Sequence, residues 1–265
     1  MVDRISRRNE KILQRIRDFR LIDDDFMTKC FEDNTECIEL VLHIVLDRSD
    51  LKVQEVKVQY TIKNLQGRSV RLDIFATDRT GKKYNIEIQR ADKGAGRKRA
   101  RYNSSLIDAN TLLAGNDTEQ LPETYVIFIT EKDTIGKNMP LYHVDRVIAE
   151  TGESFGDDLH IIYVNGDYKD ESPLGLLMKD FFCTNPADMH YKVLADRTRY
   201  FKEDKEGVAT MCKAMEDMLE EEIIENKKEI AISMIKDGAL SLEKIATYVG
   251  LTIEEIKKLA EKEAE

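Results

Sequence analysis

Apolar and polar residues alternate in two short segments near the middle of the chain. In residues 70–76, aliphatic side chains at every second position share one face of an extended strand, and Asp73 lies on the opposite face. Residues 84–89 alternate in the same way, which places Glu87 and Gln89 together on one face. The residues between the two segments include Asp and Gly, which are typical of tight turns. The pattern therefore predicts a β-hairpin that brings Asp73 close to Glu87.

The pattern on either side of this hairpin predicts further helices and strands. Apolar residues recur at helical spacing or alternate as in strands, and glycine or proline residues separate several of the segments. The predicted helices are residues 26–31, 34–46, 97–113 and 174–182, and the predicted strands are residues 53–64, 125–130 and 159–164. The order helix, three strands, helix, strand predicts an α/β fold in which helices flank a mixed sheet.

The last part of the chain has a different pattern. Residues 200–207 are polar and predict a hinge, and the chain from there onward is helical in pattern. Short amphipathic segments follow at residues 231–235, 241–249 and 252–260. We therefore predict an α/β domain over residues 1–205 and a helical tail over residues 206–265. The tail fits a helix-turn-helix motif or a small oligomerisation bundle, and the sequence leaves both open.

Composition limits the class of protein. Charged residues make up 35% of the 265 residues and aromatic residues 7%, which is typical of a polar, soluble protein. No apolar run approaches the ~20 residues that span a bilayer, and the charged N-terminus lacks the apolar stretch of a signal peptide. The four cysteines show no CxxC spacing, so free thiols are expected rather than zinc ligands or disulfides. We expect a cytoplasmic protein without a membrane partner.

Basic residues are concentrated just after the hairpin. The net charge of −10 argues against non-specific nucleic-acid binding by the whole surface. The local basic residues are Arg90, Lys93, Arg97, Lys98, Arg99 and Arg101. A basic stripe beside carboxylates suits a polyanionic substrate, and a solvated charged surface is the alternative. Arg90, Arg97 and Arg101 are the predicted nucleic-acid contacts, and the last two lie one helical turn apart.

The predicted pair of carboxylates also points to a metal ion. Asp73 and Glu87 cost free energy when held together unless a proton or a cation offsets their repulsion. A hard divalent ion such as Mg²⁺ prefers oxygen ligands of this kind. The alternative is a separate salt bridge for each acid, for example between Asp73 and Arg71.

These residues, taken in order, resemble a known family. The spacing Asp73…Glu87-x-Gln89 is similar to the metal-binding signature of the PD-(D/E)XK nuclease superfamily. Three longer runs resemble the branch called PD-(D/E)XK nuclease family transposases, or Rpn-like recombination-promoting nucleases: residues 66–73, 85–90 and 100–105. The resemblance extends roughly over residues 26–201. It implies a restriction-endonuclease-like core of order αβββαβ and a nuclease-like domain over residues 1–205.

The resemblance also implies roles for individual residues. Asp73 and Glu87 would ligate Mg²⁺ or Mn²⁺ together with the Ile88 carbonyl and water. Gln89 stands where the superfamily commonly has Lys, so it can orient water but supplies no charge. An acid on the first helix often completes such a site. Glu36 and Glu39 are the candidates, and we prefer Glu39 because it interrupts the apolar pattern.

The expected function is metal-dependent endonucleolytic hydrolysis of DNA, linked through the family to recombination or mobile elements. Cleavage of both strands normally needs two sites, which makes a homodimer the expected partner arrangement. The alternative is a degenerate nuclease fold that binds nucleic acid or protein without catalysis. The residues do not distinguish a DNA substrate from an RNA substrate.

Overall fold

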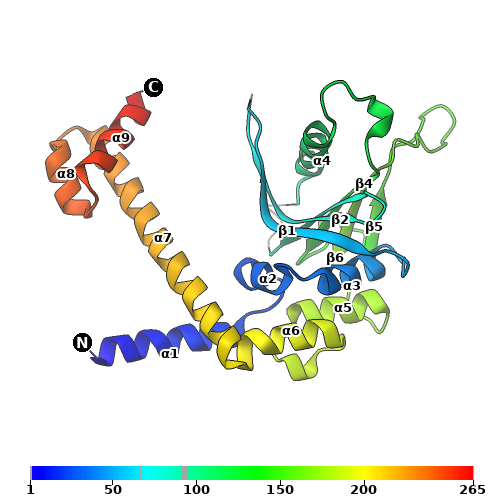
Figure 1. The fold of residues 1–265 in the computed structure, drawn as a ribbon, viewed down its shortest axis with the longest axis horizontal. Helices are drawn as coiled ribbons and strands as arrows, with labels where there is room; N and C mark the ends of the chain where they lie inside the picture. The colour runs from blue at the N-terminus through cyan, green and yellow to red at the C-terminus, as the bar shows by residue number, and fades with distance from the viewer. Residues whose placement is uncertain (1, 66, 91–94, 265) are drawn as a thin grey trace. The chain divides into compact units, whose positions relative to one another are not determined.

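The computed structural model describes residues 2–65, 67–90 and 95–264 (Figure 1). By their internal contacts the residues divide into two units. One unit is Gln14–Asp204, and the other combines Met1–Leu13 with Lys205–Glu265. None of the helices in the described ranges has both the length and the apolar composition that a membrane span requires.

A single six-stranded sheet forms the centre of the Gln14–Asp204 unit. Its strands are β1 (Val53–Ile62), β2 (Val70–Asp78), β3 (Lys83–Gln89), β4 (Thr124–Thr130), β5 (Leu141–Val144) and β6 (Leu159–Asn165). Their order across the sheet is β1-β2-β3-β4-β6-β5. The first three strands are antiparallel, β3, β4 and β6 are parallel, and β5 closes the edge in antiparallel orientation. The sheet is therefore mixed, as predicted.

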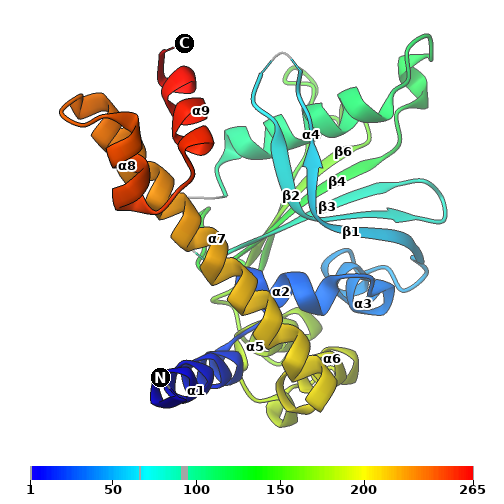
Figure 2. The ribbon, with the colours of Figure 1, turned by 60° about the vertical axis from the view of Figure 1, so that its left-hand side comes forward.

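Helices cover both faces of this sheet. They are α2 (Asp24–Phe31), α3 (Thr35–Val45), α4 (Arg97–Thr111), α5 (Pro173–Phe182) and α6 (Lys192–Glu203), with 3-10 turns at Thr118–Gln120 and Pro186–Asp188. Helix α4 lies on one face and the other helices lie on the opposite face (Figures 1 and 2). The order α3, β1, β2, β3, α4, β4 confirms the predicted αβββαβ core, and with it the restriction-endonuclease-like fold class.

Local sequence explains why the central hairpin and helix α3 form where they do. The Asp78 carboxylate accepts hydrogen bonds from the backbone N–H groups of Thr80 and Lys82, at 2.8 and 3.1 Å. Gly81 in the same turn has a φ of +91°, which a residue without Cβ adopts without strain. The Asn34 side chain caps α3 by accepting from the Cys37 N–H at 3.0 Å. These polar side chains therefore set the turn between β2 and β3 and the start of α3.

The second unit is helical, and its ends differ from the prediction. Helix α1 (Val2–Asp18) crosses the boundary between the units, and α7 (Lys205–Asp237), α8 (Leu242–Val249) and α9 (Ile253–Ala264) form the tail. The boundary between the units falls within residues 200–207, the predicted hinge. This segment is helical except at Asp204, which alone separates α6 from α7. The segment predicted at residues 231–235 is the end of the long helix α7.

The C-terminal part of α7 packs with α8 and α9 (Figure 2). Their buried contacts come from Ala231, Ile245, Ala246, Val249 and Ile256. Gly250 ends α8 in the left-handed conformation, with a φ of +66°. The segments therefore form a three-helix cluster, and its role as a DNA-reading motif or an oligomerisation segment stays a prediction.

Candidate active site

The hairpin brings the two predicted carboxylates together. The β2–β3 register pairs Ile74 with Ile86, and one further step along this register places Asp73 opposite Glu87. Beyond this point a side chain takes the place of a backbone acceptor, because Asp73 Oδ2 accepts a hydrogen bond from the Ile88 N–H at 2.8 Å. The Gln89 Nε2 group donates to the same oxygen at 3.3 Å. Asp73, Glu87 and Gln89 therefore occupy one place, at the end of the hairpin pairing.

Helix α4 supplies the partners of Glu87. The Glu87 side chain is fully buried, with 0% of its surface exposed. Its Oε2 atom forms an ion pair with the Arg99 guanidinium, and its Oε1 atom accepts from Asn103 Nδ2 at 3.4 Å. Arg99 is one turn before Asn103, so both side chains leave α4 on the face toward the sheet. The helix thus brings a cation and an amide to a carboxylate that water does not reach.

Burial and the charge of a neighbouring acid raise the pKa of both Asp73 and Glu87. Burial raises the pKa of Asp73 to about 6, and the charge of Asp24 adds to the shift, whereas the hydrogen bond from Ile88 and the Arg99 guanidinium oppose it. Burial and the charge of Asp73 raise the pKa of Glu87 to about 7, against the opposing effect of Arg99. At neutral pH the pair therefore favours a proton or a cation.

Asn85 is a further polar residue at the site that the sequence did not single out. Its side chain is fully buried, two residues before Glu87 on the same strand face, and it lowers the pKa of Glu87. Neither its nitrogen nor its oxygen makes a hydrogen bond of normal geometry with another described residue. An unpaired buried amide is costly, so Asn85 suits a site that binds water or an ion. A polar residue between apolar neighbours of a buried strand is the signal that could have identified it.

The structure does not bring Glu39 to the carboxylate pair. Its carboxylate accepts the Val53 N–H at 2.9 Å and pairs with Lys52 at 3.0 Å. Val53 is opposite Asp78 in the sheet, and five residues of strand separate Asp78 from Asp73, or about 17 Å. The other candidate, Glu36, lines a separate cavity next to α6.

Asp24, at the start of α2, lies closer to the pair. Its Oδ1 atom accepts from Gln59 Nε2 at 2.9 Å. Gln59 lies between two residues of β1 that pair with the neighbours of Asp73, namely Val58 with Ile74 and Tyr60 with Leu72. The charge of Asp24 also raises the pKa of Asp73. The helix that presents an acid to this part of the sheet is therefore α2 and not α3, which the sequence pattern could not show.

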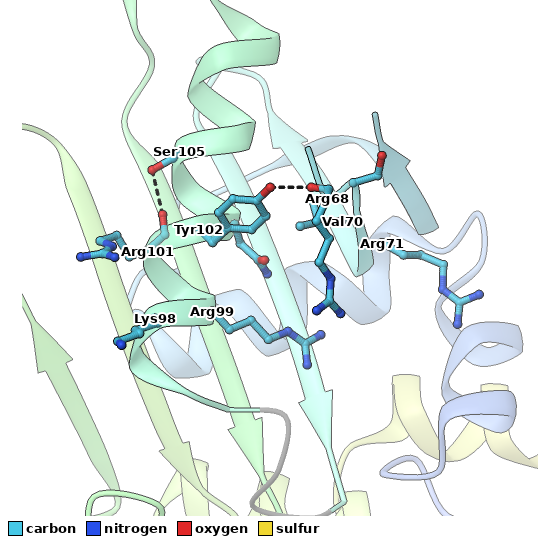
Figure 3. Close-up of a pocket in the computed structure, with 10 residues that line it drawn as sticks. Arg68, Val70, Arg71, Lys98, Arg99, Arg101, Tyr102 and Ser105 are labelled. Atoms are coloured by element: carbon cyan, nitrogen blue, oxygen red, sulfur yellow. Dashed lines mark hydrogen bonds between the residues drawn. The ribbon is translucent and has the colours of Figure 1, made fainter. Parts of the chain in front are cut away.

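Cationic side chains line a cavity of about 690 Å³ beside helix α4 (Figure 3). The basic residues in its wall are Arg68, Arg71, Lys98, Arg99 and Arg101. Arg99 belongs both to this wall and to the ion pair with Glu87. Tyr102 holds the two walls together, because its hydroxyl donates to the Arg68 carbonyl at 2.5 Å. We refer to this feature as the cationic cavity.

The predicted basic contacts are distributed over three places. Arg101 lines the cationic cavity. Arg97 lines a second cavity, on the other side of the start of α4. Arg90 pairs with Asp23, with 3.2 Å between Nε and Oδ1. The sequence missed Arg68 and Arg71 as cavity residues because Arg68 comes from the β1–β2 connection and Arg71 from β2, and neither belongs to the basic run itself.

The donor set can be compared with what a divalent ion needs. Within the described residues, no three side chains of His, Cys, Asp or Glu are grouped to hold a metal on their own. The oxygen donors at the hairpin are the two carboxylates and the backbone carbonyl of Ile88, which are hard ligands of the type that Mg²⁺ and Mn²⁺ prefer. Their raised pKa values and the unpaired Asn85 amide fit a site completed by a cation and water.

Comparison with known proteins agrees with this arrangement. The model of one family, described as PD-(D/E)XK nuclease family transposase, matches residues 30–167. The match covers just over half of the chain and includes the hairpin, α4 and the parallel strands. No curated protein and no solved structure shows a significant match. The family resemblance of the hairpin motif is therefore confirmed, and this chain, with its paired acids on a mixed sheet, belongs to the PD-(D/E)XK nuclease family transposases.

Proposed function

We propose that the protein is a metal-dependent endonuclease that hydrolyses phosphodiester bonds in DNA. The observation that carries this proposal is the pair Asp73 and Glu87, buried together with raised pKa values beside a cationic cavity. Two acids in such a place are costly for a purely structural role. The family supports a nuclease fold and a nucleic-acid substrate.

Asp73, Glu87 and the Ile88 carbonyl are the residues that would hold Mg²⁺ or Mn²⁺. The hydrogen bonds from Ile88 and Gln89 both use Oδ2 of Asp73, so Oδ1 is the oxygen that would be offered to the ion. Such an ion supplies Lewis acidity at the scissile phosphate. Arg99 lines the cationic cavity as well as pairing with Glu87, so with an ion held at Glu87 its guanidinium would be available to bind a phosphate oxygen.

The remaining groups orient the attacking water and the substrate. The Nε2 group of Gln89 is held by Asp73, so its amide oxygen is fixed and can accept a hydrogen bond from the water. Gln89 carries no charge, and Arg99 is the cation nearest to Glu87 that can stabilise the developing negative charge. The other cations of the cavity bind backbone phosphates without reading the sequence. A role in recombination or mobile-element transfer, and a homodimer for double-strand cleavage, belong to the same proposal.

A second candidate function is nucleic-acid binding without catalysis. The specific observation in its favour is that Arg99 already neutralises Glu87, in a site where the superfamily's Lys is replaced by Gln89. In this case the ion pair between Arg99 and Glu87 would be permanent, and the cationic cavity would bind nucleic acid without cleavage.

Cleavage of supercoiled plasmid DNA separates the two functions. Wild-type protein is incubated with Mg²⁺, Mn²⁺ or EDTA, beside Asp73→Ala and the matched control Asp50→Asn, whose carboxylate pairs with Arg48 at the surface. Metal-dependent nicking that is lost only in Asp73→Ala supports the nuclease. Absence of cleavage by a folded wild-type protein that still binds DNA supports the binding function.

A further inference from the structure

The N-terminus of α4 borders a cavity of about 340 Å³ that the candidate active site does not use. The helix begins at Arg97 after Gly96, which offers no side chain to cap it, and its first turn carries no acidic residue. The first N–H groups of a helix have no acceptor within the helix, and together with the helix dipole they attract anions. All helices share this property, so it indicates a bound anion only if other hydrogen-bond donors at the same cavity also lack an acceptor.

Two hydroxyl groups in the wall of this cavity meet that condition. Tyr163 on β6 is only 3% exposed, and its hydroxyl has no hydrogen-bond partner among the described residues. The Thr134 hydroxyl lines the same cavity and is also buried, with no partner in the described part of the chain. Buried hydroxyls are normally paired. Two unpaired hydroxyls at one cavity therefore indicate an acceptor that the protein itself does not supply.

Among the described residues, the cavity wall carries one cation, Arg97, and one acid, Asp133. Arg97 and Tyr163 line the same cavity; burial raises the pKa of Tyr163, and the Arg97 guanidinium opposes this shift. The Asp133 carboxylate already accepts from the N–H groups of Ile135, Gly136 and Asn138 at 3.0, 2.8 and 2.7 Å and from the Tyr142 hydroxyl at 2.6 Å. The groups left for a ligand are thus hydrogen-bond donors.

The sheet fixes this cavity relative to the paired carboxylates. Glu87 is opposite Phe128 in the parallel β3–β4 pair, and Phe128 is opposite Tyr163 in the β4–β6 pair. Residues in register on parallel strands point to the same face, so Glu87 and Tyr163 both lie under α4, two strand spacings or about 10 Å apart. A Cβ atom built on Gly96 meets no described atom within 4 Å, so the start of α4 is open to a ligand.

We propose that this cavity binds a backbone phosphate of the nucleic-acid strand near the bond that Asp73 and Glu87 would cleave. The Arg97 guanidinium, the hydroxyls of Tyr163 and Thr134, and the first N–H groups of α4 donate to the phosphate oxygens. The identity of the substrate rests on the proposed function, whereas the phosphate chemistry rests on the donors themselves. A free or terminal phosphate has the same chemistry, and the experiment must separate it from an internal one.

The test measures binding of a fluorescent oligonucleotide to the full-length protein in EDTA, so that cleavage plays no part. The variants are Arg97→Gln and Tyr163→Phe, and the controls are Arg79→Gln, in the exposed hairpin turn, and Tyr125→Phe, whose hydroxyl is bonded to Glu123. We expect binding to weaken about tenfold in each variant and not in the controls. Arg97→Gln should also reduce the slope of log K against log salt by about one.

Neutral methylphosphonate linkages, placed one at a time along the oligonucleotide, then locate the phosphate. One position should weaken binding to wild-type protein and have no further effect on Arg97→Gln, because the lost contact is the same. Equal effects at every position in both proteins would overturn the proposal. So would inorganic phosphate that binds wild type but not Arg97→Gln while oligonucleotide binding is unchanged, because the cavity then takes free phosphate.

Failure of the proposed hydrolysis is distinguishable from failure of this inference. If one methylphosphonate position is coupled to Arg97 but the protein does not cleave DNA with Mg²⁺ or Mn²⁺, the phosphate site is supported and the nuclease function is refuted. If the protein cleaves DNA but no methylphosphonate position is coupled to Arg97, the nuclease function is supported and the phosphate site is refuted. A wild-type protein that binds neither the oligonucleotide nor inorganic phosphate also refutes the site.

Discussion

Arg99 on α4 forms an ion pair with the fully buried carboxylate of Glu87 on β3. This contact holds the helix that carries the basic residues against the strand that carries the acids. In Arg99→Gln the buried carboxylate would have no cation, so we expect the free energy of unfolding in EDTA to fall by about 2 kcal/mol, a value reduced for the partly exposed guanidinium. Urea denaturation measures the change, with Lys98→Gln as the control from the same helix turn.

Addition of Mg²⁺ extends this prediction. A divalent ion at Glu87 would replace the lost guanidinium, so the stability difference between wild type and Arg99→Gln should shrink in Mg²⁺. An unchanged difference would mean that the ion does not reach Glu87, and would favour the non-catalytic binding function.

The raised pKa values of Asp73 and Glu87 predict how stability depends on pH. In the folded protein these values are about 6 and about 7, above those of the unfolded chain. The folded state therefore binds more protons between about pH 4 and pH 7, and its stability falls as pH rises through this range. We expect a loss on the order of 3 kcal/mol in EDTA between pH 5 and pH 8.

Thermal unfolding measures this pH dependence. Mg²⁺ or Mn²⁺ should restore the melting temperature at pH 8 and have little effect at pH 5, because the ion displaces protons from its ligands. In the double variant Asp73→Asn, Glu87→Gln, this part of the pH profile should be flat. A wild-type profile as flat as that of the double variant would contradict the shifted pKa values.

Asp24 and Glu39 give opposite predictions for the third acid. Asp24 raises the pKa of Asp73, so Asp24→Asn should lower the cleavage rate or the metal affinity about tenfold and leave the fold intact. Glu39 instead holds the Val53 N–H and Lys52. Glu39→Gln should therefore cost about 1 kcal/mol of stability and leave cleavage unchanged. Cleavage rates over a Mg²⁺ titration, with urea denaturation of both variants, decide between the two acids.

The difference between these two acids shows what the sequence could predict. Asp73, Glu87 and Gln89 lie on neighbouring strands of one hairpin, so the period of two and the turn were enough to bring them together. The same local signals predicted the αβββαβ order of the core. The same alternation could also have predicted Asn85 as a site residue, because Asn85 lies on the same strand face as Glu87.

Contacts between distant elements have no such signal. The charge of Asp24 acts on Asp73 because α2 packs against β1 and β2, and Arg71 and Arg101 line one cavity because α4 lies across the same sheet. Tyr163 lines the cavity at the start of α4 because β6 is two strands away from β3. Periodicity describes one element at a time, whereas the packing of elements decides these three relationships.

Gln89 is predicted to act on water and not on the metal. Its amide is fixed by Asp73. An alanine would remove the acceptor and one long hydrogen bond to Asp73, which keeps the shorter bond from the Ile88 N–H. Gln89→Ala should lower kcat about 100-fold with little change in the Mg²⁺ concentration needed for half-maximal rate. Single-turnover cleavage over a Mg²⁺ titration separates the two quantities. A variant that instead needs far more Mg²⁺ would assign Gln89 to the metal shell.

The cationic cavity makes a prediction that does not depend on catalysis. Arg71 comes from β2 and Arg101 from α4, and both side chains line the cavity, so a phosphate backbone in it would contact both walls. Replacement of either residue by Gln should reduce the salt slope of DNA binding by about one and weaken binding to all sequences equally.

The double variant Arg71→Gln, Arg101→Gln tests whether the two arginines contact separate phosphates. If they do, the losses of binding free energy in the two single variants should add within experimental error. Fluorescence anisotropy in EDTA at several salt concentrations measures these effects, with Arg146→Gln as a control, because Arg146 pairs with Asp157 outside the cavity. A reduction of the same size in the control would mean that overall charge governs binding. A reduction confined to the cavity variants would identify the groove between β2 and α4 as the path of the nucleic acid past the paired carboxylates.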